Sequence, residues 1–219
     1  MEKYLEILKK CPLFSEIDEK DIPKMLTCLG ARVDSFDKKY TVMAEGSKAK
    51  YLGIVLSGEV QTEQTDFYGN RSILSVAGAG EVFAEAFACS NTDTLPVSVV
   101  AVKPGEIMFI DCAHILHVCK NGCSFHNRLI FNLMRDIASK TVMFHQKIEV
   151  ISKRTTREKL LSYLSMVSKK EGSSVFTIPF DRQQLADFLE VDRTGLSAEI
   201  GKLKKEGIIE CRKNHFELL

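Results

Sequence analysis

This sequence of 219 residues lacks the features that mark three common protein classes. No stretch approaches the roughly 20 consecutive apolar residues of a membrane span, and the charged N-terminus lacks the apolar run of a signal peptide. Basic and acidic residues nearly balance, 30 against 29, so no strong overall field favours nucleic acid or membranes as partners. These absences predict a cytoplasmic protein with no membrane partner.

Seven cysteines are present, but none forms a CxxC pair, so we expect reduced thiols rather than a disulfide framework. Histidine is absent before His114, so the N-terminal half offers no imidazole ligands for a metalloenzyme of the cupin type. The later histidines, His114, His117, His126 and His145, are expected to be surface or hydrogen-bonded residues. The sequence therefore predicts neither an enzyme nor a metal site nor a cofactor, although haem bound through a histidine stays open.

Glycines punctuate the first half of the chain at regular steps, at Gly46, Gly58, Gly69 and Gly80. Short β-branched and apolar runs lie between and after them, for example Val97 to Val102. Short strands at a spacing of roughly 8–12 residues with glycine turns are typical of an all-β sandwich, barrel or jelly roll. Residues 1–121 are therefore predicted to form one domain, a double-stranded β-helix (jelly roll) with short helices in its first thirty residues.

A long helix is predicted over residues 122–151. Its apolar positions follow near-heptad spacing: Ile130, Leu133, Ile137, Phe144, Ile148 and Ile151. Such a narrow seam either packs on its own domain or pairs with a second copy of the chain as a coiled coil. We favour the pair, because the seam continues through the stretch that should connect two domains.

Two short amphipathic helices follow within residues 152–219. The first carries Leu185, Phe188 and Leu189 on one face, and Asp192 caps a second helix whose buried positions are Leu196, Ile200 and Leu203. Two such helices with a three-to-four-residue turn form a helix-turn-helix. A short strand before them and a hairpin after them predict the winged form, against the plainer interpretation of a small helical domain with a solvated basic face.

The outward face of the second helix is the one that enters a major groove in this motif. Arg193 can contact guanine through two hydrogen bonds, and Thr194 or Ser197 can reach a base edge or a phosphate. Lysines along the helix and Arg182 before it are expected to contact phosphates. The candidate DNA-binding residues are Arg182, Asp192, Arg193, Thr194, Ser197, Ala198 and Lys202, with Lys204 and Lys205 beyond them.

Nearly the whole chain resembles the Crp/Fnr family of bacterial transcription regulators. The segment from Asp192 to Ile200 matches the recognition-helix pattern in register, but Ala198 stands where a basic residue is common and Gly195 lies inside the helix. We therefore expect an operator other than the family's best-known palindrome. The fold class implied is α+β: a β-roll sensor domain, a long dimerisation helix and a winged helix-turn-helix.

The resemblance also implies an effector site. Cyclic-nucleotide binders of the family hold ribose and phosphate with a Gly-Glu pair and a later Arg-Ser. Here Glu85 can stand in for the sugar-binding carboxylate, but Ala84 replaces the glycine, and Leu95 and Pro96 replace Arg-Ser. A cyclic nucleotide is therefore not expected. An apolar or aromatic effector would suit the pocket predicted from Phe83, Glu85, Phe87, Leu95, Pro96, Val97 and Val142, unless these residues are only the core of the roll.

Some family members hold an iron–sulfur cluster through N-terminal cysteines, but Cys11 and Cys28 are too few for that pattern. Cys119 and Cys123 could form a thiol switch, against the simpler interpretation that they are ordinary small side chains.

These features predict a homodimer that binds a palindromic operator in double-stranded DNA and responds to an unknown small-molecule effector, with RNA polymerase as a partner that the resemblance implies. Effector binding would change the population of dimers whose recognition helices have the spacing of two half-sites, roughly 34–36 Å apart. The alternative is an effector-sensing β-roll dimer that regulates a protein partner without binding DNA.

Overall fold

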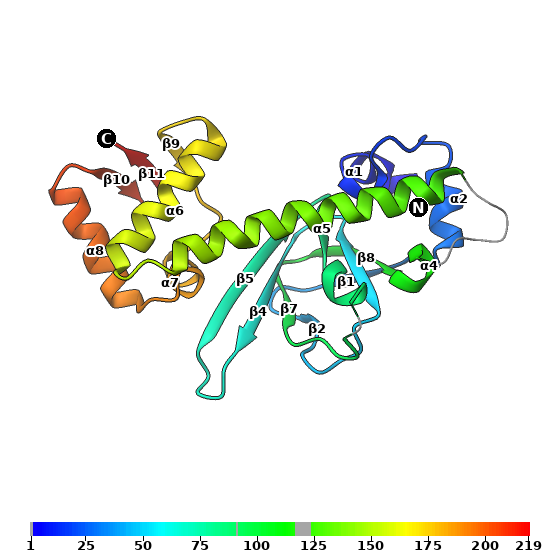
Figure 1. Cartoon of the computed structure of the whole chain (residues 1–219), viewed down its shortest axis with the longest axis horizontal. Coiled ribbons are helices and arrows are strands. Elements are labelled where there is room, and N and C mark those ends of the chain that lie inside the picture. Colours follow the sequence, from blue (N-terminus) through cyan, green and yellow to red (C-terminus); the bar gives the residue numbers. More distant parts are fainter. Residues whose placement is uncertain (1, 91, 117–123) are drawn as a thin grey trace. The chain divides into compact units, whose positions relative to one another are not determined.

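The computed structural model describes residues 2–90, 92–116 and 124–219 (Figure 1). Its elements, in chain order, are η1 (Glu2–Tyr4), α1 (Leu5–Leu8), η2 (Pro12–Phe14), α2 (Ile22–Cys28), β1 (Arg32–Phe36), β2 (Thr41–Met43), β3 (Tyr51–Val55), β4 (Glu59–Thr65), β5 (Arg71–Gly78), β6 (Val82–Phe83), α3 (Glu85–Ala88), β7 (Ser98–Lys103), β8 (Gly105–Asp111), α4 (Cys112–Leu116), α5 (Ser124–Ile151), α6 (Thr156–Glu171), β9 (Val175–Thr177), α7 (Arg182–Leu189), α8 (Arg193–Lys205), β10 (Ile209–Arg212) and β11 (His215–Leu218). They group into an N-terminal unit, residues 1–69 and 74–141, and a C-terminal unit, residues 70–73 and 142–219.

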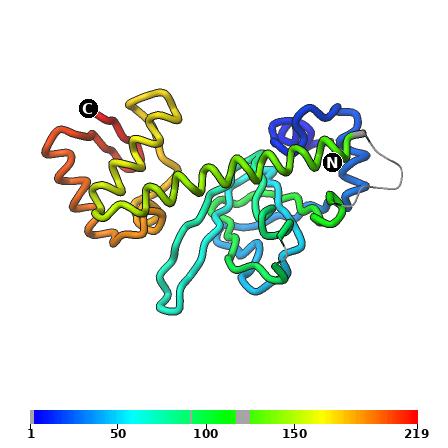
Figure 2. The backbone as a smooth tube through the Cα atoms, in the orientation of Figure 1, coloured from blue at the N-terminus to red at the C-terminus, as the bar shows by residue number. Residues whose placement is uncertain are grey.

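The N-terminal unit contains two four-stranded sheets, in the orders β1-β8-β3-β6 and β2-β7-β4-β5. The order of the strands shows that the chain passes repeatedly from one sheet to the other, and Figure 2 traces its backbone from end to end. One glycine turn is sterically required: Gly58 has φ +84°, and a Cβ there would lie 2.6 Å from the carbonyl oxygen of Pro104. The predicted jelly roll is confirmed.

The core of this unit joins the N-terminal helices to one sheet and to the first half of α5. Leu8, Phe14 and Leu26 pack with Leu52 and Ile110 of the strands. Leu129 and Leu133 of α5 are buried in the same cluster, with Ile130 and Ile137 packed against it. The early positions of the predicted seam are therefore occupied within their own protomer.

One stripe of α5 that is exposed in the single chain carries Phe131, Met134, Val142, Phe144 and Ile148, and the exposed fraction reaches 59% at Met134 and 58% at Ile148. Met143 is also exposed but lies about 100° around the helix from Phe144. Large apolar side chains on one helix are rarely left in water over such a length without a partner. Phe144 and Ile148 were predicted as seam positions, whereas Phe131 and Met134 lie one residue beyond the predicted Ile130 and Leu133.

The C-terminal unit contains the last part of α5 from residue 142, the helices α6, α7 and α8, and a three-stranded sheet in the order β10-β11-β9. Capping boxes start α6, through Thr155 and Glu158, and α7, through Asp181 and Gln184. Tyr163, Phe180 and Phe188 form an aromatic cluster with ring centroids 4.8–6.2 Å apart. The winged helix-turn-helix is confirmed. None of the helices that the structure describes is long and apolar enough to span a membrane.

Candidate nucleic-acid interface and effector site

A tight turn joins α7 to α8 and sets the start of the candidate recognition helix. Glu190 adopts the left-handed conformation at φ +53°, which ends α7. Asp192 then accepts a hydrogen bond of 2.7 Å from the backbone N–H of Gly195 and caps α8. Because the cap is local, the direction of α8 is fixed by residues that are adjacent in sequence.

The two faces of α8 differ sharply. Leu196, Ile200 and Leu203 are buried against the unit, whereas Arg193 and Thr194 in the first turn are exposed. Ser197 and Ala198 continue this exposed face, which we name the α8 outer face (Arg193, Thr194, Ser197 and Ala198). The Ser197 hydroxyl donates a hydrogen bond of 2.9 Å to the carbonyl of Arg193. Arg193 supplies the cationic side chain of the α8 outer face.

The predicted phosphate-binding residues lie in different surroundings. Arg182 is half-buried, with Nη2 3.4 Å from the carbonyl oxygen of Lys213 and 3.5 Å from Cys211 Sγ, so it supports the turn between β10 and β11. Lys202 is exposed and pairs with Glu199 at 3.3 Å. Lys204 pairs with Glu210 of the hairpin at 3.4 Å. Arg182 therefore contributes to the wing as well as being a candidate for DNA contact.

Arg157 of α6 was not singled out by the sequence analysis. It contacts Glu206 through two hydrogen bonds and Glu199 at 3.4 Å, and so connects α6 to α8. The guanidinium lowers the pKa of Glu206, chiefly through the hydrogen bonds. Because α6 and α8 lie far apart in sequence, no local pattern could indicate this contact.

In the N-terminal unit, the segment expected to contact the effector is compactly packed. The Phe83 ring lies directly on Gly53, where a Cβ would come within 2.1 Å of the ring, so Gly53 is required for this packing. Ala84 has φ +60°, in the left-handed region that favours glycine, which explains why the resembling family has glycine there. Glu85 follows as the first residue of α3 and is only 4% exposed.

Lys140 of α5 neutralises Glu85. Its Nζ lies 3.0 Å from Glu85 Oε1 and 2.8 Å from Asp136 Oδ2, and donates to the carbonyl of Val82 at 2.6 Å. The Asp136 contact is an ion pair without well-directed hydrogen-bond geometry, and Glu85 Oε2 and Asp136 Oδ2 find no hydrogen-bond partner among the residues described. We name Glu85, Asp136 and Lys140 the buried charge cluster. The sequence offered no signal for it, because Glu85 and Lys140 meet only through the fold.

The other predicted effector residues are placed unequally. Leu95 and Val97 are buried and Phe87 is half-buried, whereas Pro96 is exposed. Val142 is exposed and belongs to the C-terminal unit. The structure thus gathers Phe83, Glu85 and Phe87 on one segment.

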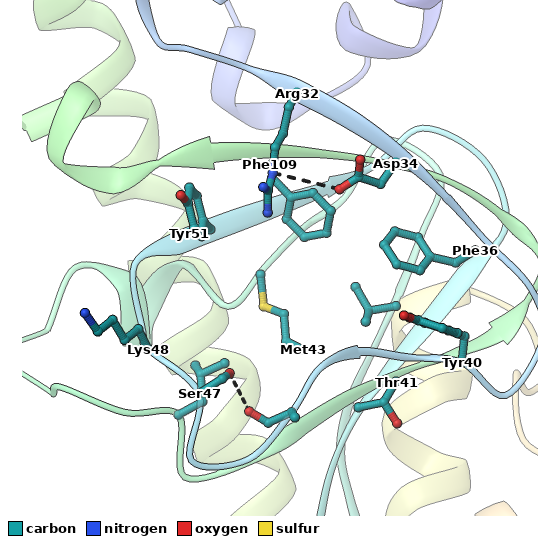
Figure 3. Close-up of a pocket in the computed structure, with 13 residues that line it drawn as sticks. Arg32, Asp34, Phe36, Tyr40, Thr41, Met43, Ser47, Lys48, Tyr51 and Phe109 are labelled. Carbon is teal, nitrogen blue, oxygen red and sulfur yellow. Dashed lines mark hydrogen bonds and ion pairs between the residues drawn. The ribbon is translucent and has the colours of Figure 1, made fainter.

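A cavity of about 500 Å³ in this unit includes Leu95 but is otherwise lined by residues outside the predicted set (Figure 3). Met43 lies at its centre, among Phe36, Tyr51 and Phe109. The Arg32 guanidinium lies 4.8 Å from the Tyr51 ring centroid and 5.3 Å from that of Phe109, and its Nε lies 3.8 Å from Oδ2 of Asp34, which also lines the cavity. A guanidinium beside aromatic walls can hold an aromatic or apolar molecule that carries a negative charge.

The described part of the chain contains no group of three or more His, Cys, Asp or Glu side chains that could hold a metal ion. His114 Nδ1 lies 3.0 Å from the Leu29 carbonyl, and His126 Nε2 lies 3.0 Å from the Ile115 carbonyl, so backbone contacts account for both rings. The predicted thiol switch of Cys119 and Cys123, and His117, lie outside the described residues.

Comparisons with known proteins match both units. Residues 33–122 match the cyclic nucleotide-binding domain family, and residues 158–219 match the Crp-like helix-turn-helix domain family. The transcriptional activator protein FnrL of Cereibacter sphaeroides is 22% identical over 191 residues, which covers 80% of this chain and 71% of FnrL. The probable transcriptional regulator flp of Lacticaseibacillus casei is 23% identical over 175 residues, which covers 79% of this chain and 77% of flp.

Among solved structures, the c-di-GMP responsive global regulator CLP of Xanthomonas campestris has the same fold. The TM-score is 0.74 at 18% identity, over 92% of this chain and 99% of CLP.

Proposed function

Because this chain belongs to the Crp/Fnr family of DNA-binding transcription regulators, we propose that it acts in the bacterial cytoplasm as a homodimer on a palindromic operator. The observation that carries the proposal is the α8 outer face. It presents Arg193 and Thr194 to solvent at the capped start of a helix whose other face is buried. A helix so presented can enter a major groove with its first turn foremost.

The exposed stripe of α5 supports the homodimer. Two copies of the stripe would cover Met134, Val142 and Ile148 of both chains, and a two-fold axis would place two α8 helices on one duplex. A symmetric pair of recognition helices explains a palindromic operator with half-sites roughly 34–36 Å apart.

The experiment that tests this function combines two measurements on the full chain. Sedimentation equilibrium at micromolar concentration should give a dimer. Duplexes selected from a random pool should then contain an inverted repeat, and their affinity should fall steeply with salt. A monomer that retains no duplex at low salt would contradict the proposal and favour regulation of a protein partner.

The effector proposal rests on the cavity beside Leu95. Its aromatic walls favour an apolar or aromatic molecule. Arg32 has only a loose pair with Asp34, 3.8 Å from Nε to Oδ2, and its side chain is 57% exposed, so its guanidinium can still contact one negative charge on that molecule. Cyclic nucleotides are disfavoured, because Leu95 and Pro96 offer no cation to a cyclic phosphate and Lys140 already pairs with Glu85 and Asp136.

Two fluorescent probes of similar aromatic shape test this effector class. Anilinonaphthalene sulfonate carries an anion that phenylnaphthylamine lacks. Replacing Arg32 by Met should weaken the sulfonate about tenfold, the value of a charge-assisted hydrogen bond, and change the neutral probe little. Lys38→Met is a control at an exposed site outside the cavity lining. Equal loss of both probes would mean that Arg32 only shapes the cavity, and cyclic AMP binding with micromolar affinity would overturn the proposed class.

A further inference from the structure

Two cysteines from separate elements meet in the N-terminal unit. Cys89 is the residue that ends α3, and Cys112 is the first residue of α4, directly after β8. Their Sγ atoms lie 2.7 Å apart, and either thiol can be the donor in this contact. Cys112 is 1% exposed, whereas Cys89 is half-buried and reachable from solvent.

The other described cysteines lack such a partner sulfur. Cys11 is buried, and its burial raises the pKa of its thiol to about 12, so it stays protonated and unreactive. Cys28 is exposed, and Cys211 contacts Arg182 and the carbonyl of Lys213. Among the cysteines that the structure describes, Cys89 and Cys112 are thus the pair placed to react with one another.

We propose that Cys89 and Cys112 form a reversible regulatory disulfide, with a hydroperoxide as the oxidant. The hydrogen bond between the two thiols lowers the pKa of Cys89 and raises that of Cys112, which makes the more accessible sulfur the nucleophile. The two Sγ atoms, 2.7 Å apart, must approach by about 0.7 Å to reach the length of an S–S bond, which is a small movement of the two segments.

The chemistry takes two steps. The Cys89 thiolate attacks one oxygen of the hydroperoxide, the O–O bond breaks, and water or an alcohol leaves after taking up a proton, so that Cys89 becomes a sulfenic acid. The Cys112 sulfur then attacks the Cys89 sulfur, the S–O bond breaks, and the departing hydroxide takes the Cys112 proton to form water. Two electrons pass from the two sulfurs to the peroxide, and a dithiol reductant reverses the result.

The disulfide would tie the end of α3 to the end of β8. Glu85 of the buried charge cluster begins the same short helix, so the cross-link would restrict movement of the segment expected to contact the effector. Formation of the bond does not depend on the proposed function, whereas its effect on DNA binding rests on that function.

The full-length protein should be treated with one equivalent of hydrogen peroxide, alkylated and cleaved before aspartate. Cleavage at Asp93 and Asp111 separates Cys89 from Cys112, so their disulfide appears as two linked peptides in mass spectra. We expect this product to predominate and to vanish after dithiothreitol. The matched variants are Cys89→Ser, which must abolish it, and the double variant Cys119→Ser/Cys123→Ser, which must retain it.

Thermal unfolding and DNA binding supply readouts beyond the mapping. Oxidation of the Cys119→Ser/Cys123→Ser variant should raise Tm by about 5 °C, because the cross-link constrains the unfolded chain, and the Cys89→Ser variant should not respond. A disulfide between Cys119 and Cys123, or sulfinic acid at Cys89 with Cys112 free, would overturn the proposal. If the disulfide forms while the protein binds no DNA in either state, the proposed function fails and the redox pair stands.

Discussion

The α8 outer face and the effector segment around Glu85 are built in opposite ways. In α8 the candidate functional side chains are exposed, and the helix that carries them is fixed by its own cap and its buried face. Around Glu85 the candidate side chains are buried, and their charge is neutralised by Lys140 from a distant helix. Substitutions of the exposed side chains of α8 should therefore affect function without affecting stability, whereas substitutions around Glu85 should affect both.

The largest effect on the free energy of unfolding is therefore expected from replacing Lys140, the cation of the buried charge cluster. Replacing Lys140 by Met leaves two buried carboxylates, Glu85 and Asp136, without a counter-charge. Breaking a buried pair in this way costs about 3–5 kcal/mol in the free energy of unfolding. Urea unfolding followed by circular dichroism measures the loss, with Lys24→Met at an exposed site of α2 as the control. If both variants unfold at the same urea concentration, the sensor is not built around this cluster.

How far the sequence could predict each region follows the same division. The cap at Asp192 and the buried positions of α8 depend on residues within one or two turns, so spacing alone indicates them. The jelly roll was also predictable, because glycine turns and short strands repeat locally.

The buried charge cluster and the pair of Cys89 and Cys112 were not predictable, because each contact joins elements that only the fold brings together. The effector residues Phe83, Glu85 and Leu95 and the DNA-binding residues stay predictions. For the sensor in particular, the chemistry of the segment depends on Lys140, which local spacing does not connect to it.

The second prediction concerns a buried charge outside the sensor, the ammonium of Lys147. Lys147 of the C-terminal unit is 8% exposed, lies 4.5 Å from the Phe188 ring centroid and has a pKa lowered by burial to about 8. Since its pKa in the unfolded chain is near 10.5, the unfolded state holds more protons between pH 8 and 10.5. The stability of this unit should therefore rise with pH across that window, by about 2 kcal/mol from pH 7.5 to 9.5.

Urea unfolding at several pH values measures this rise. The Lys147→Met variant supplies the reference, because other groups that titrate in the window are common to both proteins. Parallel pH profiles for the two proteins would show that the pKa of Lys147 is not lowered, as the hydrogen bond of its Nζ to the Ile73 carbonyl and the charge of Glu190 would favour.

The third prediction concerns DNA affinity without a change in stability. Arg193→Ala should lower the preference for the selected operator over random duplex by about 1–3 kcal/mol, because a two-hydrogen-bond contact to guanine is lost. Weak salt-dependent binding to random duplex should persist, and Tm should stay within about 1 °C because the side chain is exposed. Fluorescence anisotropy measures both duplexes, with Arg154→Ala before α6 as the control. An equal loss on operator and random duplex would make Arg193 a phosphate contact.

A smaller effect is expected from the cap that orients this face. Asp192→Ala removes the hydrogen bond to the N–H of Gly195 and should destabilise the C-terminal unit by about 1 kcal/mol. Asp192→Ser keeps a capping oxygen and should recover most of the loss. Urea midpoints of the three proteins measure the effect, and an unchanged midpoint for the alanine variant would show that α8 is held by its buried face alone.

The smallest effect should have the opposite sign. A Cβ at Gly195 would lie 3.6 Å from Asp192 Oδ2, an ordinary contact, and its backbone is helical, so alanine fits without strain. Gly195→Ala should therefore raise the free energy of unfolding by about 0.5–1 kcal/mol, because glycine is a poor helix former. Gly53→Ala is the contrasting variant: its Cβ would collide with the Phe83 ring, and it should destabilise the sensor. Equal changes in the free energy of unfolding for the two variants would contradict the contrast between the room for a Cβ at Gly195 and the close packing at Gly53. If stabilised Gly195→Ala protein also loses operator binding, the absence of a side chain at this position serves close approach to DNA rather than the fold.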